Sequence, residues 1–368
     1  MKKITILAIV IISVILFIQT RNSKPESIKL GFVAGLSGKY STLGSNVRNG
    51  VLIALEEINY KIGNKKIELI QKDDKQNSKE AKKVINELIN SDVKVIIGNT
   101  TSSMTQISID IINKHKDVLL FSPTASSNLF SSKDDGFLRT QVANSSSKFA
   151  SSVKYFMSKD IKNVISVYDS NNLAYSKDSI NNLEKAFINE NGKKFIDTIK
   201  LSESFETIKE KINKQNVDLI VVVASSIDSA KLIQYLRINN IDTTIMGSAW
   251  GRSQDFIEEG GISVEGVLFV SSYDNNSKIK RYLDFKEKFE KRFNKIPSVF
   301  AMQAYETTKI IIDTLKKDEN VNNLKINILK QKVYNGLQGE IVFDKYGDVS
   351  RDFYLVNIKD GKYQRIKK

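Results

Sequence analysis

Small hydroxyl side chains gather in two short turns of this 368-residue chain, and each turn directly follows an apolar run. The turns contain, in order, Ser102 and Ser103, then Thr124, Ala125 and Ser126. The first turn begins at Gly98, follows a strand-like run and opens a helix, where free backbone N–H groups and the helix dipole favour an anion. Ser102 or Ser103 acting only as a helix cap is the structural alternative. Pro123 fixes the second turn, which could equally be an ordinary strand-ending turn.

A third loop rich in glycine and serine runs from Gly35 to Gly44 and contains Leu43. It lies between a strand-like run at Ile28–Val33 and apolar residues at helical spacing over Val47–Asn59. Loops at the carboxyl ends of strands in open α/β sheets are where such folds bind ligands. The loop lacks the Gly-Lys-Ser/Thr ending of a phosphate-binding loop.

Composition argues against catalysis that depends on cysteine or histidine. The chain has no cysteine and one histidine, His115, which lies between two lysines at the end of an expected helix. Disulfides, thiolate metal sites and cysteine nucleophiles are therefore excluded, and a Ser-His-Asp triad or a zinc site is strongly disfavoured. We expect no catalytic residues, no metal and no cofactor.

The net charge of +14 comes mainly from lysines spread along the chain. Arginine is the residue that reads phosphates and base edges with two hydrogen bonds, and no basic block is interleaved with aromatic residues. We therefore expect a lysine-rich solvated surface and no nucleic-acid partner.

The amino terminus resembles an export signal. Lys2 and Lys3 precede an apolar run over Ile4–Ile18, and polar residues follow. A helix of this length spans about 22 Å, less than the roughly 30 Å of a hydrocarbon core. No small-residue cleavage site follows, so a cleaved signal peptide and an uncleaved signal-anchor in residues 1–22 stay open. Either one places the rest of the chain outside the cytoplasmic membrane, periplasmic or extracellular, secreted or anchored.

Strand and helix patterns alternate through two successive series, which predicts an α/β fold with two doubly wound, mostly parallel sheets. The expected strands are Ile28–Val33, Lys66–Ile70, Val93–Ile97 and Val118–Phe121, then Val164–Tyr168, Lys194–Ile199, Leu219–Ala224 and Thr244–Met246. The expected helices are Val47–Asn59, Lys79–Asn90 and Met104–Asn113, then Tyr175–Asn189, Phe205–Lys214 and Ser229–Ile238.

The opening loop, followed by Asn49-Gly50 and a helix ending in Glu57-Ile58-Asn59, resembles the type I periplasmic-binding-protein family, which includes the leucine/isoleucine/valine-binding proteins. The resemblance covers residues 28–368 and implies two lobes joined by three crossover strands. It places lobe 1 at 28–143 with 272–348, and lobe 2 at 144–271 with 349–368. Three crossings suit a clamshell that closes on its ligand.

The resemblance also implies roles for residues of both turns. Ser102 matches the serine that grips the ligand's α-carboxylate, and Thr124, Ala125 and Ser126 match a turn that binds its ammonium and carboxylate. Tyr175, at the end of the loop Tyr168–Ser176, matches a tyrosine that covers the ligand.

Two departures from the family pattern concern the ligand's ammonium. Met246–Gly251 offers no carboxylate where branched-chain receptors carry an acid, and Ala224–Ser226 replaces a second aromatic residue. A buried ammonium without an acidic partner is costly. The ligand is then a carboxylate without an α-ammonium, or another acid such as Asp228 meets the charge. Trp250 would stack on the ligand body or belong to the core.

These observations predict a solute-binding protein that captures a small carboxylate, an amino acid or an analogue, for an ABC transporter permease. The alternative is a ligand-sensing subunit that acts through a separate sensor protein, and an enzyme is a distant third. The membrane would be a partner through the amino-terminal segment if that segment is uncleaved.

Overall fold

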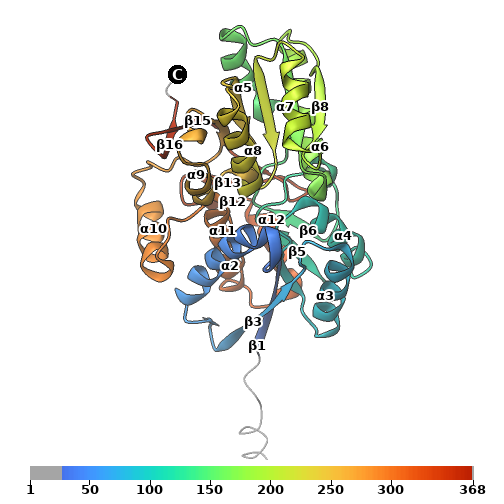
Figure 1. Ribbon diagram of the computed structural model, residues 1–368. Coiled ribbons are helices and arrows are strands. Elements are labelled where there is room, and N and C mark those ends of the chain that lie inside the picture. Colours follow the sequence, from blue (N-terminus) through green and yellow to red (C-terminus); the bar gives the residue numbers. More distant parts are fainter. Residues whose placement is uncertain (1–26, 367–368) are drawn as a thin grey trace, which may run out of the picture.

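The computed structural model describes residues 27–366, so the predicted export segment 1–22 lies outside the described residues. Two larger sheets and one small sheet form the framework, and most strands of the larger sheets run parallel (Figure 1). The predicted α/β class with two doubly wound sheets is confirmed by this topology.

The first sheet has the order β2-β3-β1-β4-β5-β6 and is parallel except for the β2–β3 pair. Its strands are β1 (Ser27–Ala34), β2 (Lys61–Ile62), β3 (Lys65–Asp73), β4 (Val95–Gly98), β5 (Leu119–Ser122) and β6 (Phe137–Arg139). Alternate side chains of β1 enter two cores, because successive residues of a strand point to opposite faces. Leu30 and Phe32 join the core that contains α2 (Ser41–Glu56), whereas Val33 joins the core of α3 (Ser78–Asn90) and α4 (Ser102–Ile112).

The second sheet has the order β16-β15-β11-β10-β9-β7-β8. Its strands are β7 (Val164–Tyr168), β8 (Asp197–Lys200), β9 (Leu219–Val223), β10 (Thr244–Gly247), β11 (Leu268–Ser271), β15 (Tyr354–Lys359) and β16 (Lys362–Arg365). The β11–β15 and β15–β16 pairs are antiparallel, and the other pairs are parallel. Its helices are α5 (Ser146–Ser158), α6 (Leu173–Asn189), α7 (Phe205–Asn213), α8 (Ser226–Ile238) and α9 (Gln254–Gly260). Buried residues from both faces of this sheet enter two separate cores, so helices cover both faces.

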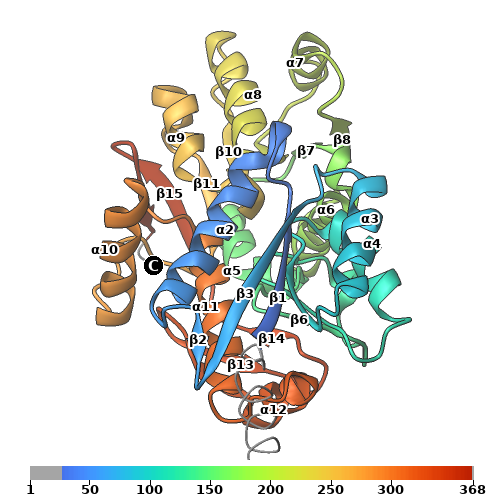
Figure 2. The same ribbon diagram turned by 90° about the horizontal axis from the view of Figure 1, so that it is seen from below.

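The remaining elements lie between β11 and β15 of the second sheet in the chain but pack beside the first sheet. They are α10 (Lys280–Phe293), α11 (Val299–Leu315), α12 (Leu324–Gln331) and the small sheet of β12 (Val333–Asn335), β13 (Glu340–Phe343) and β14 (Val349–Ser350). Helix α11 runs along α2, as Figure 2 shows.

The chain passes between the sheets after β6, after β11 and after β14. An ion pair joins the first of these crossings to the third: Arg139, at the end of β6, lies 2.6 Å from the Asp348 carboxylate, just before β14. The lobe boundaries at 143, 271 and 348 lie in or next to these stretches and stay a prediction.

The predicted glycine-rich loop is shorter than expected. Helix α2 begins at Ser41 rather than near Val47, and a single 3-10 turn, η1 (Gly38–Tyr40), precedes it. Gly44 therefore lies inside the helix, where a Cβ atom would come 2.1 Å from the carbonyl oxygen of Gly35. Here glycine allows a close approach between helix and loop; it does not mark a turn.

Candidate functional site

The two hydroxyl-rich turns lie against each other, because they follow the neighbouring parallel strands β4 and β5. The Ser127 backbone N–H donates to the Ser102 Oγ over 3.2 Å, and the Thr124 hydroxyl donates to the carbonyl oxygen of Thr100 over 2.7 Å. Ala125 donates its backbone N–H to the Ser122 hydroxyl over 3.1 Å. Ser102 and Ser126 are each 2 % exposed, so the turns form one buried polar unit.

The sequence left open whether Ser102 or Ser103 only caps helix α4, and the structure decides this point. The residue at the N-cap position is Thr101, and Ser102 is the first residue inside the helix. Ser102 and Ser103 are therefore not helix caps. The hydroxyl of Ser102 accepts a hydrogen bond from the neighbouring turn instead, and the Thr101 side chain at the N-cap makes no capping hydrogen bond.

Gly98 shapes the first turn. Its φ is +139°, a backbone conformation that L side chains rarely adopt, and a Cβ atom there would lie 2.2 Å from the carbonyl oxygen of Val33. The glycine lets the chain leave β4 directly over the end of β1. The turn thus begins at the carboxyl edge of the sheet, where parallel α/β sheets bind ligands.

Ser103 joins this unit to the start of α6, a helix that packs on the second sheet. Its backbone N–H donates to the Asn172 side-chain oxygen over 3.1 Å, and its hydroxyl accepts the backbone N–H of Ala174 over 3.2 Å. A further contact joins the same two parts: the Asn128 backbone N–H donates to Asp178 over 2.9 Å. The two sheets therefore meet directly beside the hydroxyl-rich turns.

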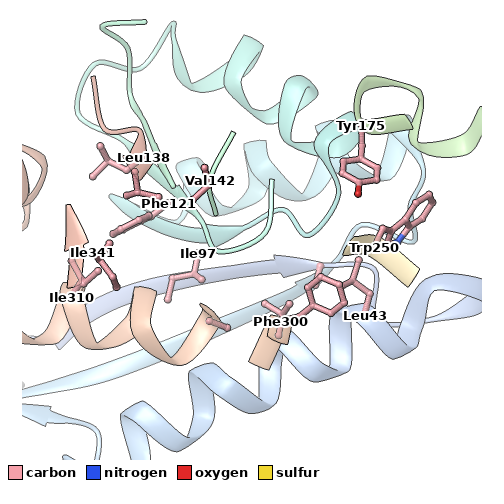
Figure 3. Packing of buried hydrophobic residues seen from close by; sticks show 14 of the residues in the cluster. Leu43, Ile97, Phe121, Leu138, Val142, Tyr175, Trp250, Phe300, Ile310 and Ile341 are labelled. Atoms are coloured by element: carbon pink, nitrogen blue, oxygen red, sulfur yellow. The ribbon is translucent and has the colours of Figure 1, made fainter. Parts of the chain in front are cut away.

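Three aromatic rings lie at the same meeting point. Trp250 stacks on Tyr40, with ring centroids 5.7 Å apart, and meets Tyr175 edge-on at 6.0 Å. Figure 3 shows Tyr175 and Trp250 across from Leu43 and Phe300, with the Tyr175 hydroxyl directed toward that side. Burial raises the pKa of the Tyr175 hydroxyl, and burial followed by the neighbouring Asp169 raises that of Tyr40. Both phenols are therefore neutral hydrogen-bonding groups at physiological pH.

A small cavity of about 20 Å³ lies beside these rings. Its lining includes Leu43, Trp250 and Phe300, with Ser225 and Ser226 of the α8 start. A cavity of this size holds about one water molecule. A larger ligand therefore needs the two faces to separate before it can enter.

Charged groups tie the two faces together at the edge of this cavity. The Lys39 ammonium lies 2.8 Å from the Asp228 carboxylate and 3.8 Å from that of Asp169. Asp169 also accepts the Tyr40 hydroxyl over 2.7 Å, and Asp228 accepts the Ser225 hydroxyl over 2.6 Å. The sequence had suggested Asp228 as a partner for a ligand ammonium, but Lys39 of the chain itself pairs with it.

The structure thus places the predicted residues in two adjoining groups. One comprises Ser102, Ser103, Thr124, Ala125 and Ser126; the other comprises Leu43, Tyr175 and Trp250. Ser103 links them through Ala174, the residue before Tyr175.

Sequence reasoning missed Lys39, Tyr40 and Asp169, although all three lie in loops singled out for the site. Their positions in the chain could have identified them, because Lys39 and Tyr40 follow the carboxyl end of β1, and Asp169 follows that of β7.

Residues 27–366 contain no group of three or more His, Cys, Asp or Glu side chains placed to hold a metal ion. Over the same residues, no helix is both long and apolar enough to cross a membrane.

The sequence model of a family described as periplasmic binding protein matches residues 27–362, which is nearly all of the described chain. The chain belongs to the periplasmic binding protein family. The expected family is confirmed, and its matched relatives are binding proteins rather than enzymes.

Curated relatives are named as amino-acid-binding proteins. The Leu/Ile/Val-binding protein of Escherichia coli is 22% identical over 329 residues, which cover 88% of each chain. The leucine-, isoleucine-, valine-, threonine- and alanine-binding protein of Pseudomonas aeruginosa is 22% identical over 341 residues, with 90% of this chain and 89% of that protein covered.

Solved structures share the fold. A solute-binding protein of an ABC transporter from R. palustris, in complex with benzoate, has a TM-score of 0.84 at 18% identity, covering 92% of this chain and 95% of the other. The substrate-binding protein LivJ from Streptococcus pneumoniae, in complex with isoleucine, has a TM-score of 0.82 at 23% identity, covering 93% and 100%. These neighbours include one ligand with an α-ammonium and one without.

Proposed function

We propose that this protein is an extracytoplasmic solute-binding protein that captures a small carboxylate between two closing lobes and presents it to an ABC transporter. The observation that carries the proposal is the contact between the hydroxyl-rich turns of the first sheet and α6 of the second, made through Ser103. A ligand held there would touch both lobes, so binding and closure would be coupled.

In this proposal the two turns hold the carboxylate. Ser102 and Ser126 supply hydroxyls, Thr124 and Ala125 shape the second turn, and the start of α4 contributes N–H groups and a favourable dipole. Leu43, Tyr175 and Trp250 would then surround the ligand's apolar body. An aromatic face with a polar tip suits a ligand that is apolar with a charged end.

The charges around the cavity favour an acid without an α-ammonium. Asp228 and Asp169 are the carboxylates beside Trp250's cavity, and both face Lys39. A ligand ammonium would have to displace Lys39 or stay without an acidic partner, and an unpaired buried charge is costly. We therefore infer that deaminated analogues of apolar amino acids bind at least as well as the amino acids.

The partner and the location follow from the same proposal. The permease of an ABC transporter is the partner that would recognise the closed form, because two structures with this fold are named as solute-binding or substrate-binding proteins of transporters. Residues 1–22 would export the chain and, if retained, hold it at the outer face of the cytoplasmic membrane.

A thermal-shift screen of the purified protein tests the proposal. The screen uses apolar amino acids, their deaminated acids and the corresponding primary amides. A true ligand at 100 times its dissociation constant stabilises the protein by about 2.7 kcal/mol. Stabilisation by acids but not by their amides supports the proposal. A panel without any stabilising acid would contradict it.

A further inference from the structure

Lys148 is a buried cation that the proposed carboxylate site does not use. It lies in the first turn of α5 and is 5 % exposed. Its ammonium donates to the side-chain oxygen of Asn144 over 2.9 Å, and it lies 5.5 Å and 5.6 Å from the ring centroids of Phe149 and Phe353. An ammonium has three donors, and buried charges in proteins are normally paired with an opposite charge. The acceptor found here is a neutral amide.

A small cavity lies beside Lys148, inside the second sheet's α5–α6 layer. Its volume is about 10 Å³. The apolar part of its lining comprises Phe149, Leu183, Val221, Val223, Met246 and Val270. Four residues with polar groups also line it: Lys148, Tyr175, Ser179 and Ser248.

The hydroxyl of Ser248 lines the same cavity as Lys148. Ser248 is 7 % exposed, and its Oγ has no hydrogen bond of good geometry among residues 27–366, although the Tyr175 phenol lies near it. Buried hydroxyls are usually satisfied, so this one needs an explanation. A buried lysine and a buried hydroxyl residue therefore line one largely apolar cavity, and both are side chains that can bind an anionic oxygen.

Tyr175 lies between this inner cavity and the outer cavity described above. Its ring lines the inner cavity and meets Trp250 edge-on, and Trp250 lines the outer cavity beside Leu43. Figure 3 shows Tyr175 and Trp250 next to each other, with Leu43 across from them. A modest shift of the Tyr175 side chain would therefore join the two cavities into one elongated site.

We propose that Lys148 and Ser248 form a second anion-binding subsite behind Tyr175, which takes the far carboxylate of a small dicarboxylic acid. The inference rests on the proposed function, because the near carboxylate occupies the hydroxyl-rich turns. The inner cavity holds about one water molecule as it stands, so occupation by a carboxylate requires the Tyr175 ring to move outward.

The surroundings of Lys148 make its charge adjustable. The charged groups that face it are Asp178 of α6 and Arg139 of β6, and burial lowers the pKa of Lys148 to about 8. Asp178 is itself held by Asn128 and Asn144. Lys148 is thus charged at neutral pH and loses its charge under mildly alkaline conditions.

Calorimetric titration of two matched acid pairs tests the proposal: hexanoate against hexanedioate, and benzoate against benzene-1,4-dicarboxylate. We expect a diacid to bind the wild-type protein about tenfold or more tightly than its monoacid, as a hydrogen bond to a charged group implies. Lys148→Met should abolish this preference. Lys154→Met, on the same helix with its side chain 67% exposed, should retain it.

The pH dependence in the wild-type protein gives an answer even if Lys148→Met folds poorly. Both acids stay fully ionised from pH 7 to 9.5, whereas Lys148 deprotonates near pH 8. The diacid preference should therefore fall by up to about tenfold per pH unit above 8. A preference that is absent, or constant over this range, overturns the subsite and leaves only a water-sized cavity. If monoacids bind normally, the proposed function survives that result; if no acid binds, both proposals fail.

Discussion

The Lys39 ammonium lies 2.8 Å from the Asp228 carboxylate, so the segment between β1 and α2 is tied to the first turn of α8. This contact joins the two larger sheets across the cavity that Trp250 lines. It also uses the acid that the sequence offered to a ligand ammonium. One ion pair thus bears on both closure and ligand choice.

Lys39→Met should weaken closure and change ligand preference. Lys39 is half exposed, so the loss of its pairs should reduce affinity for a deaminated acid only about two- to fivefold. The same change frees Asp228 and Asp169, so the affinity for leucine relative to 4-methylpentanoate should rise. Calorimetry at two salt concentrations measures both effects. Lys231→Met, an exposed lysine on α8, is the control. If the ratio of the affinities for leucine and 4-methylpentanoate did not change, Lys39 would not determine ligand preference.

Ser126→Ala and Ser102→Ala should differ in their effect on stability. Both should weaken binding of a carboxylate, by about 1.5–3 kcal/mol for a lost hydrogen bond to a charged group. Ser102→Ala should also lower the free energy of unfolding by about 1 kcal/mol, because its hydroxyl accepts the Ser127 N–H. Calorimetry and denaturant unfolding, with Ser158→Ala as an exposed control, measure the two effects. Unaltered affinity in both variants would move the site elsewhere.

Trp250 should report closure by its fluorescence. It is the single tryptophan in the chain, it is 6 % exposed, and it stacks on Tyr40 across the two sheets. A saturating ligand should shift its emission to shorter wavelength as water leaves the ring. Tyr40→Leu removes the stacking partner and should reduce this shift. Binding seen by calorimetry without any change in emission would show that closure does not occur around Trp250.

Lys148→Met should stabilise the protein at neutral pH. The Lys148 pKa is 10.5 when unperturbed and about 8 in the fold, so the folded state holds fewer protons than the unfolded state between these values. Wild-type stability should therefore rise as the pH increases from 8 to 10.5, by an amount of the order of 3 kcal/mol. The variant should lack this rise and gain a similar amount at pH 7, since an apolar side chain replaces a buried charge. Urea unfolding at pH 7, 8.5 and 10 measures it. If the free energy of unfolding changed equally with pH in the variant and the wild type, a group other than Lys148 would cause the pH dependence.

Element order could be predicted from the sequence because hydrophobic periodicity marks each buried strand and helix independently. Strands such as Val164–Tyr168 were predicted with the bounds that the structure has. Other boundaries differ from the prediction. Strand β8 was expected at Lys194–Ile199 and spans Asp197–Lys200, and α2 begins at Ser41, six residues before the expected start at Val47. The error at α2 arises where a tertiary contact, the approach of Gly44 to Gly35, decides the local conformation.

The candidate site could be predicted only where its loops follow neighbouring strands of one sheet. Turns after β4 and β5 must be neighbours in a parallel sheet, so Ser102 and Thr124 could be grouped in advance. Contacts between the two sheets carry no such signal. Which residue of one sheet faces Asp169 or Asp228 depends on the lobe orientation, so the roles of Lys39 and Tyr40 emerged only from the structure.

Calorimetric titration of the purified protein with 4-methylpentanoate, its primary amide and leucine tests the central claim most directly. The three ligands share one apolar body and differ in the carboxylate and the ammonium. The account predicts saturable binding of the acid, no measurable binding of the amide, and leucine no tighter than the acid. Equal binding of amide and acid, or leucine binding a hundredfold tighter, would contradict it.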